Sequence, residues 1–237
     1  MCEVCVARGV PHLPSRRLML GAGLAAAALP FASTVRAQTP RLAETPDAAI
    51  KLLAEGNARY AANAPNNRDF SATRAARVQG QAPFAAVLGC ADSRVSPELV
   101  FDQAPGDLFV VRVAGNFLTT DGLGSLEYGA AVLGTRVIVV LGHTSCGAVN
   151  ATVEALQKGN NLPGHIADLV TAMKPGIEPV VKQGGTDLNQ RAVVANVQAN
   201  VKRLAESKPI ISDMVAAGKL RIVGGVYELA TGKVTMV

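Results

Sequence analysis

Three short, largely apolar runs give this chain its clearest pattern. Residues 84–90 are apolar apart from Gly89, and similar runs lie at 107–115 and 136–142. Continuous apolar character over such short runs is typical of strands that are buried on both faces of a parallel sheet. Helical patterns lie between the runs. The sequence therefore predicts an α/β fold in which a mainly parallel central β-sheet is flanked by helices.

Capping signals place several of these helices. Thr45 can cap a helix that starts at Pro46 and extends to about Ala62, because proline suits a first helical turn. Asp187, three residues before Gln190, fits a capping box for a helix that reaches about residue 207. Further helices are expected near 96–98, at 123–133 and 147–157, in a short piece at 166–173 within a Gly-, Pro- and Asn-rich segment, and at 211–217.

The sequence also predicts a hairpin at the C-terminal end and an apolar stripe on the first helix. Residues 220–229 and 233–237 predict a C-terminal strand hairpin, joined at Ala230-Thr-Gly232. The helix that follows Thr45 carries an apolar stripe of Ile50, Leu53 and Tyr60. Such a stripe must be covered either by this core or by a neighbouring subunit.

Length and composition are consistent with a single domain that has a full hydrophobic core. The chain has 237 residues, of which 49% are hydrophobic, enough for a full core, and we expect a single domain at 45–237 after a linker at 38–44. The net charge of +5 is concentrated in residues 1–37, where four arginines face Glu3 alone. No basic stripe with interleaved aromatic residues follows, which argues against a nucleic-acid partner.

The first 37 residues resemble an export signal. Arg16 and Arg17 precede the weakly apolar segment 21–29, and Val35-Arg-Ala37 offers the small residues that a signal peptidase reads. Paired arginines before such a segment resemble a twin-arginine signal, whose machinery exports folded proteins. An uncleaved anchor is the alternative, but about 14 apolar residues fall short of the ~20 that span a bilayer. We therefore expect cleavage of 1–37, no stable membrane insertion, and a periplasmic or otherwise exported protein.

Polar and metal-binding side chains gather where two predicted strands end. Cys90, Asp92 and Arg94 close the first apolar run, and His143 and Cys146 follow the third. Open parallel sheets bind ligands beyond the carboxyl ends of their strands. Two thiols and one imidazole suit zinc, with one coordination position left open for chemistry. The pattern predicts a catalytic metal site.

Each of these residues also has an ordinary structural interpretation. A cysteine at the end of a strand is often a small core residue, and a solvated Asp-x-Arg pair contributes little stability. In an exported protein, the pair Cys90 and Cys146 also fits a disulfide. A thiol-redox or zinc-storage protein is therefore an alternative, although it leaves Asp92 and Arg94 unexplained. The C-x-x-C of Cys2 and Cys5 is weak evidence for any site.

Two motifs carry a family resemblance. Cys90-Ala-Asp-Ser-Arg94 followed by Gly142-His-x-x-Cys-Gly147 resembles the signature of the β-class carbonic anhydrases. The resemblance extends over residues 45–237 and includes the segments 105–112 and 225–232. It implies the fold of that family as well as its chemistry.

The resemblance implies a zinc enzyme. It suggests one Zn²⁺ per subunit, held by Cys90, His143 and Cys146, with water in the fourth position. The implied reaction is reversible hydration of carbon dioxide to bicarbonate and a proton by zinc-bound hydroxide. A hydrolase that splits carbon disulfide or carbonyl sulfide on the same scaffold is an alternative.

The resemblance also assigns roles to Asp92 and Arg94. Two thiolates cancel the zinc charge, so the bound water needs a nearby acceptor, and Asp92 kept ionised by Arg94 would provide it. In some members the aspartate instead binds zinc and silences the enzyme. The chain has no tryptophan, so the tryptophan of the regulatory bicarbonate pocket has no counterpart. We therefore expect the open, water-bound form.

Four further residues occupy family positions that line the substrate pocket. These are Gln81, Phe109, Tyr128 and Gly147. In many members the Phe and Tyr come from the partner subunit, which implies a homodimer or a higher even oligomer. Ala148 stands where many relatives have a second glycine, which is a departure from the family pattern.

Overall fold

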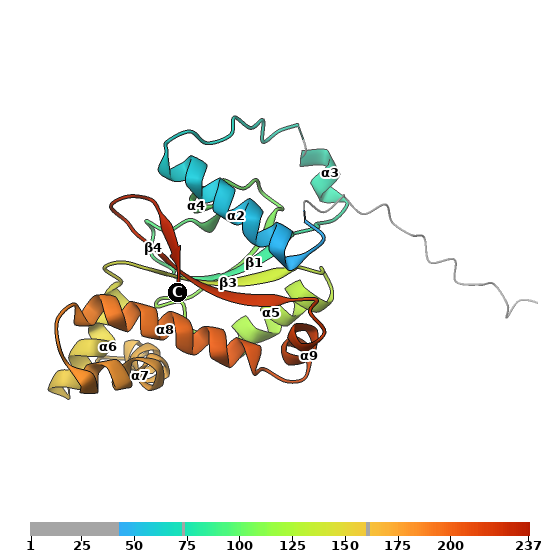
Figure 1. The fold of residues 1–237 in the computed structure, drawn as a ribbon. Coiled ribbons are helices and arrows are strands. Elements are labelled where there is room, and N and C mark those ends of the chain that lie inside the picture. The colour runs from blue at the N-terminus through green and yellow to red at the C-terminus, as the bar shows by residue number, and fades with distance from the viewer. Residues whose placement is uncertain (1–42, 73, 160–161) are drawn as a thin grey trace, which may run out of the picture. The chain divides into compact units, whose positions relative to one another are not determined.

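The computed structural model describes residues 43–72, 74–159 and 162–237. The predicted signal at 1–37 lies outside these residues, and so does the predicted linker apart from residues 43 and 44. The described chain folds around a five-stranded sheet in the order β2-β1-β3-β4-β5 (Figure 1). The strands are β1 (Ala85–Gly89), β2 (Leu108–Arg112), β3 (Val137–His143), β4 (Arg221–Tyr227) and β5 (Val234–Met236).

The sheet has a parallel core and an antiparallel end. Strand β1 pairs in parallel with both β2 and β3, and β3 pairs in parallel with β4. Only β5 runs antiparallel to its neighbour, closing the predicted hairpin. All five residues of β1 and all seven of β3 are buried, which is why both strands read as continuous apolar runs. The predicted fold class is confirmed.

Helices cover both faces of this sheet (Figure 1). Helices α2 (Pro46–Ala61) and α4 (Pro97–Val100) lie on one face, and their apolar residues join an apolar cluster with alternate residues of β1 and β3. The opposite face carries a second cluster. The helices on that side are α5 (Thr120–Ala131), α6 (Gly147–Lys158), α7 (Ile166–Gln183), α8 (Leu188–Ala205) and α9 (Ile210–Ala216), while the short α3 (Arg74–Val78) precedes β1.

The first helix forms as its sequence predicts. Thr45 has an extended backbone, and its side chain accepts a hydrogen bond from the Ala48 amide at 3.2 Å. This satisfies one of the free N–H groups at the start of the helix. Leu53 is buried, and Ile50 and Tyr60 pack against the same cluster. The stripe is therefore covered at least in part by this core.

Two helix predictions are wrong in detail. The piece expected at 166–173 is an 18-residue helix that continues through Pro175 and Pro179. Val170, Met173 and Ile177 are buried along one face of it, and this packing holds the helix together across positions where proline removes a backbone donor. Asp187 is the N-cap residue of α8, as predicted, but its backbone is left-handed (φ 54°) and its side chain makes no capping bond.

Two smaller points complete the fold. His143 is the last residue of β3, whereas the sequence placed it just past the strand. Among the described residues, no helix combines the length and the apolar character needed to cross a membrane.

Candidate metal centre

Three metal-ligating side chains meet at the carboxyl end of the sheet. One ligand atom from each of Cys90, His143 and Cys146 lies within 4.8 Å of the others, and all three residues are buried. Cys90 follows β1 and His143 ends the adjacent strand β3. Ser145 then adopts a left-handed backbone (φ 55°), and this tight turn returns the chain so that Cys146 lies beside His143. The predicted convergence of these residues is seen in the structure.

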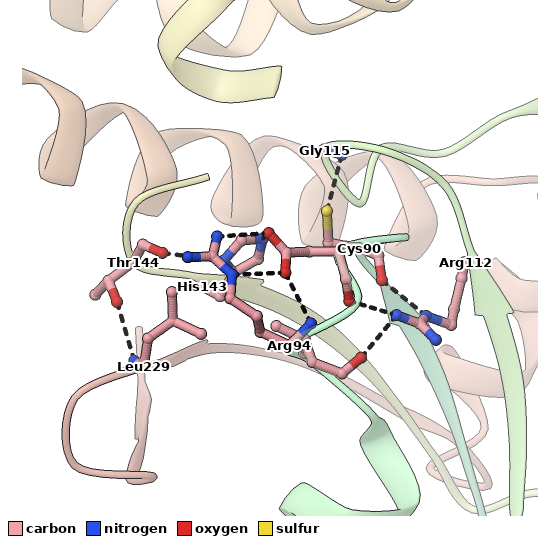
Figure 2. A network of polar contacts seen from close by, with 9 residues as sticks. Cys90, Arg94, Arg112, Gly115, His143, Thr144 and Leu229 are labelled. Atoms are coloured by element: carbon pink, nitrogen blue, oxygen red, sulfur yellow. Dashed lines mark hydrogen bonds and ion pairs between the residues drawn. The ribbon is translucent and has the colours of Figure 1, made fainter. Parts of the chain in front are cut away.

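The imidazole of His143 is fixed in one orientation. Its Nδ1 lies 3.0 Å from the Thr144 carbonyl, which can only accept, so Nδ1 carries the proton (Figure 2). Thr144 is itself held by β4, since its amide donates to the Tyr227 carbonyl at 3.0 Å and its hydroxyl accepts from the Leu229 amide at 3.1 Å. Nε2 is left buried without a hydrogen-bond partner. Its lone pair is therefore available to a metal ion.

The two thiols differ in acidity. A hydrogen bond from Cys146 lowers the pKa of Cys90 to about 4 against the effect of burial, and His143 and the Gly115 amide contribute to the shift. The same thiol–thiol contact, with burial, raises the pKa of Cys146. The Gly115 amide donates to the Cys90 sulfur at 3.3 Å (Figure 2). Neither cysteine is in a disulfide, so both sulfurs are available, and the Cys90 sulfur is the more acidic of the two.

A carboxylate held by an arginine stands at the edge of this cluster. Arg94 donates from Nε and Nη2 to the two carboxylate oxygens of Asp92 at 2.9 and 2.7 Å, and from its backbone amide at 2.9 Å. The Arg94 guanidinium holds the pKa of Asp92 well below its usual range. Oδ2 of Asp92 lies 3.8 Å from Nε2 of His143. A permanently ionised acceptor thus faces the cluster.

Arg112 holds the loop that carries these groups, a role that was not predicted from the sequence. It donates to the carbonyls of Cys90, Asp92 and Val95 at 2.8, 2.7 and 2.8 Å. Arg112 ends β2 and pairs in register with Gly89, the last residue of β1. A charged residue at the carboxyl end of a neighbouring strand is the signal that could have indicated it.

The family follows from comparison with known proteins. Residues 85–234 match the family model described as carbonic anhydrase. The chain belongs to this family. It is 41% identical over 192 residues to carbonic anhydrase 2 of Mycobacterium tuberculosis, covering 81% of this chain and 92% of that protein. It is 42% identical to the carbonic anhydrase of Mycolicibacterium smegmatis, covering 81% and 93%.

Solved structures place the fold in the β class. The chain is similar to the β-carbonic anhydrase CcaA, with a TM-score of 0.64 and 28% identity over 79% of this chain and 86% of the other. It is also similar to the Coccomyxa β-carbonic anhydrase in complex with acetazolamide. That structure gives a TM-score of 0.62 and 31% identity, over 70% and 77% of the two chains.

Of the remaining predicted site residues, only Gly147 adjoins the cluster in the chain, and Phe109, Tyr128 and Gln81 lie on other segments. Phe109 pairs in register with Ala86, well before the carboxyl end of β1, and its ring centroid lies 6.4 Å from that of Tyr128 on α5. Tyr128 is 48% exposed. Gln81 is exposed in the segment before β1. Gly147 opens α6 directly after Cys146, and nothing lies within 4 Å of the position that a Cβ would take there.

The donor set suits a zinc ion by its chemistry. Two sulfurs and one imidazole nitrogen, buried together and with the nitrogen lacking any partner, are typical zinc ligands.

A separate apolar cavity of about 120 Å³ lies between α2 and the sheet. None of the cluster residues lines that cavity, so it is not the site of this chemistry. Its lining residues are Ile50, Leu53, Ala54, Asn57, Phe101, Val139, Val223, Val234 and Met236.

Proposed function

We propose that this protein is a zinc-dependent carbonic anhydrase that catalyses the reversible hydration of carbon dioxide to bicarbonate and a proton. The observation that carries the proposal is the buried cluster of Cys90, His143 and Cys146, with Nε2 of His143 unpartnered. Membership of the carbonic anhydrase family over most of the chain supports the reaction. We assign the three cluster residues as ligands of one Zn²⁺ per subunit.

The protein residues prepare the site for this ion. Zinc, when bound, supplies the Lewis acidity that makes a water molecule a strong nucleophile near neutral pH. The Thr144 carbonyl keeps the proton of His143 on Nδ1, so Nε2 remains a donor to the metal. The low pKa of Cys90 makes one thiolate available before the ion arrives. Burial of all three residues excludes competing water from the ligand atoms.

Asp92 and Arg94 orient the reacting water. The guanidinium binds both carboxylate oxygens, so Asp92 cannot rotate freely toward the ligands and stays ionised. An ionised carboxylate can only accept hydrogen bonds. Oδ2, which lies 3.8 Å from His143 Nε2, would therefore accept a hydrogen bond from a water at the site, and so orient a lone pair of the water oxygen toward the substrate. This arrangement supports the open form of the site.

The test is carbon dioxide hydration by stopped flow across pH, on purified protein whose zinc content is measured. Wild type is expected to carry one zinc per chain and to be active. Asp92→Asn should keep its zinc, because it alters no ligand, and should lose about 10²-fold in kcat, because the ionised acceptor is gone. Cys146→Ser should lose both zinc and activity. Near-wild-type hydration by Cys146→Ser would refute the site.

We propose that the enzyme is a homodimer or a higher even oligomer. Tyr128 on α5 and Val132, which follows α5, are 48% and 65% exposed, and the Tyr128 ring lies beside that of the half-buried Phe109 of the edge strand β2. A second copy that covers this surface would bring Phe109 and Tyr128 to its partner's substrate pocket, together with Gln81 and Gly147. Light scattering should report an even oligomer for wild type and monomers for Tyr128→Asp; a monomeric, fully active wild type would refute the proposal.

We also propose that residues 1–37 are a twin-arginine signal that directs the folded enzyme out of the cytoplasm. The support is the pair Arg16 and Arg17 ahead of an apolar segment and a small-residue cleavage site. Cell fractionation should find the mature protein, starting near Gln38, in the periplasm. The double change of Arg16 and Arg17 to Lys should retain the full-length chain inside. Equal export of that variant would refute the proposal.

A further inference from the structure

Three polar side chains on one face of α8 reach the loop that follows β2. Asn196, Asn200 and Arg203 are spaced by four and three residues, so they lie along one side of the helix. Asn196 and Asn200 are 1% and 6% exposed. Buried amides are costly unless they are hydrogen-bonded. These bonds go to the loop after β2 and to each other, which distinguishes the set from ordinary core packing.

The contacts hold the loop at two points. Asn196 Nδ2 donates to the Gly115 carbonyl at 2.8 Å. Asn200 Oδ1 accepts from the Leu118 amide at 2.8 Å, and Arg203 donates to the Leu118 carbonyl at 2.8 Å. Asn200 Nδ2 donates to the backbone carbonyl of Asn196 at 2.8 Å, which links the two amides. The helix thus fixes both ends of a four-residue turn.

The turn needs this support because its backbone is unusual. Gly115 and Asn116 both have positive φ, 84° and 42°, a conformation that residues other than glycine rarely adopt. A Cβ on Gly115 would lie 2.4 Å from the Met173 sulfur, so α7 presses on the same residue. Gly115 is also the residue whose amide donates to the Cys90 sulfur at 3.3 Å, a bond visible in Figure 2.

We propose that Asn196 is a positioning residue of the metal centre, which acts through Gly115 on the thiolate of Cys90. This inference rests on the proposed function, since it takes Cys90 as a zinc ligand. Without Asn196, the buried Gly115 carbonyl has no donor, and the turn must rearrange to find one. The amide of Gly115 then leaves the sulfur. Groups that hold a ligand in this way are typically worth 10- to 100-fold in metal affinity.

The test compares wild type with Asn196→Leu, which keeps a similar volume but has no N–H donor. Zinc affinity is measured by competition with a chromophoric chelator. The sulfur-to-metal charge-transfer band is recorded after substitution with Co²⁺. We expect about tenfold weaker zinc binding and a shift of the band to lower energy, because a thiolate that loses an N–H donor gives up its electrons more easily.

Leu204→Ala is the matched control, since Leu204 is a fully buried residue of the same helix and the same apolar cluster. It should lower stability but keep wild-type zinc affinity and the wild-type band. If Asn196→Leu does not fold, Asn196→Ala is measured in the same way. Wild-type affinity and an unshifted band in the Asn196 variant would overturn the inference. A wild type that binds no zinc would instead overturn the proposed function.

Discussion

The absence of a side chain at Gly142 allows β3 and α8 to pack closely together. A Cβ on Gly142 would lie 2.6 Å from Val197 Cγ2 and 3.3 Å from Val193 Cγ1. Carbon atoms in contact prefer about 3.5–4.0 Å, so Gly142→Ala must move the strand and the helix apart by about 1 Å. Valine cannot rotate away, because one rotamer dominates in a helix. The expected cost is about 1–3 kcal/mol of unfolding free energy.

The same geometry predicts that a second change relieves the first. Val197→Ala alone removes two buried methyl groups and should cost about 2 kcal/mol. On that background the Cβ added by Gly142→Ala fills vacated space and also removes a flexible glycine from a strand, which is worth about 0.5–1 kcal/mol. The double variant should therefore be at least as stable as Val197→Ala alone. The coupling energy between the two positions should exceed about 1 kcal/mol.

The assay is urea unfolding of wild type, both single variants and the double variant at equal zinc loading. Circular dichroism is the appropriate probe, because the chain has no tryptophan. Since Val197 is adjacent to Asn196, the Gly142→Ala variant should also bind zinc more weakly than wild type, and the double variant should recover part of that loss. Strictly additive free energies would refute the proposed close contact between β3 and α8.

Further predictions concern stability away from the metal. The side chain of Asp102 is 2% exposed and binds Arg59 and Arg68. Burial alone would raise the pKa of this carboxyl group, but the two arginines lower it. Its contribution is therefore complete above about pH 4 and is lost as the pH falls through the lowered pKa. Asp102→Asn should cost about 2 kcal/mol at pH 7 and flatten the acid decline in urea midpoints; an unchanged decline would contradict this. Gly56→Ala should cost about 3 kcal/mol or more, because its Cβ would lie 1.8 Å from the backbone oxygen of Phe101, the residue that follows α4. Gly124→Ala, with open space around it, should instead raise the free energy of unfolding by about 0.5–1 kcal/mol, and equal effects of the two changes would refute the reasoning.

The sheet and the ligand cluster could be predicted from sequence because their signals are local. Strands β1 and β3 are buried on both faces, so each reads as an apolar run with no polar alternation. Cys90 and His143 lie at the ends of those runs, and the rule that parallel sheets bind ligands beyond the carboxyl ends of their strands brings them together. The turn from His143 to Cys146 needs only a few residues.

The helix predictions that were wrong in detail relied on local sequence signals. Pro175 and Pro179 argued for short helical pieces, yet the buried stripe of α7 holds one continuous helix. Asp187 stands at the predicted N-cap of α8, but its backbone is left-handed and its side chain makes no capping bond. For α7, burial against other elements outweighs a propensity that a short window of sequence can read.

The supporting contacts of the site could not be predicted because they join distant segments. Asn196 and Gly115 are 81 residues apart, and Arg112 reaches Cys90 across 22 residues. Neither contact produces a periodic pattern or a motif. A buried asparagine on an apolar helix face is a visible anomaly in the sequence, but only the structure shows which carbonyl it binds.

These distant contacts share a property that bears on how the site works. Each of these contacts uses at least one backbone group: the guanidinium of Arg112 donates to three backbone carbonyls, the Thr144 carbonyl accepts from the His143 imidazole, and the Asn196 amide donates to the Gly115 carbonyl. Cys90 and His143 are therefore each held through a loop that is fixed from another strand or helix. A site held in this way is formed before the metal binds, so little binding energy is needed to order the ligands. The network gives a physical reason why a buried pair of thiols and an unpartnered imidazole nitrogen can be maintained together: the fold stabilises the arrangement that the metal requires.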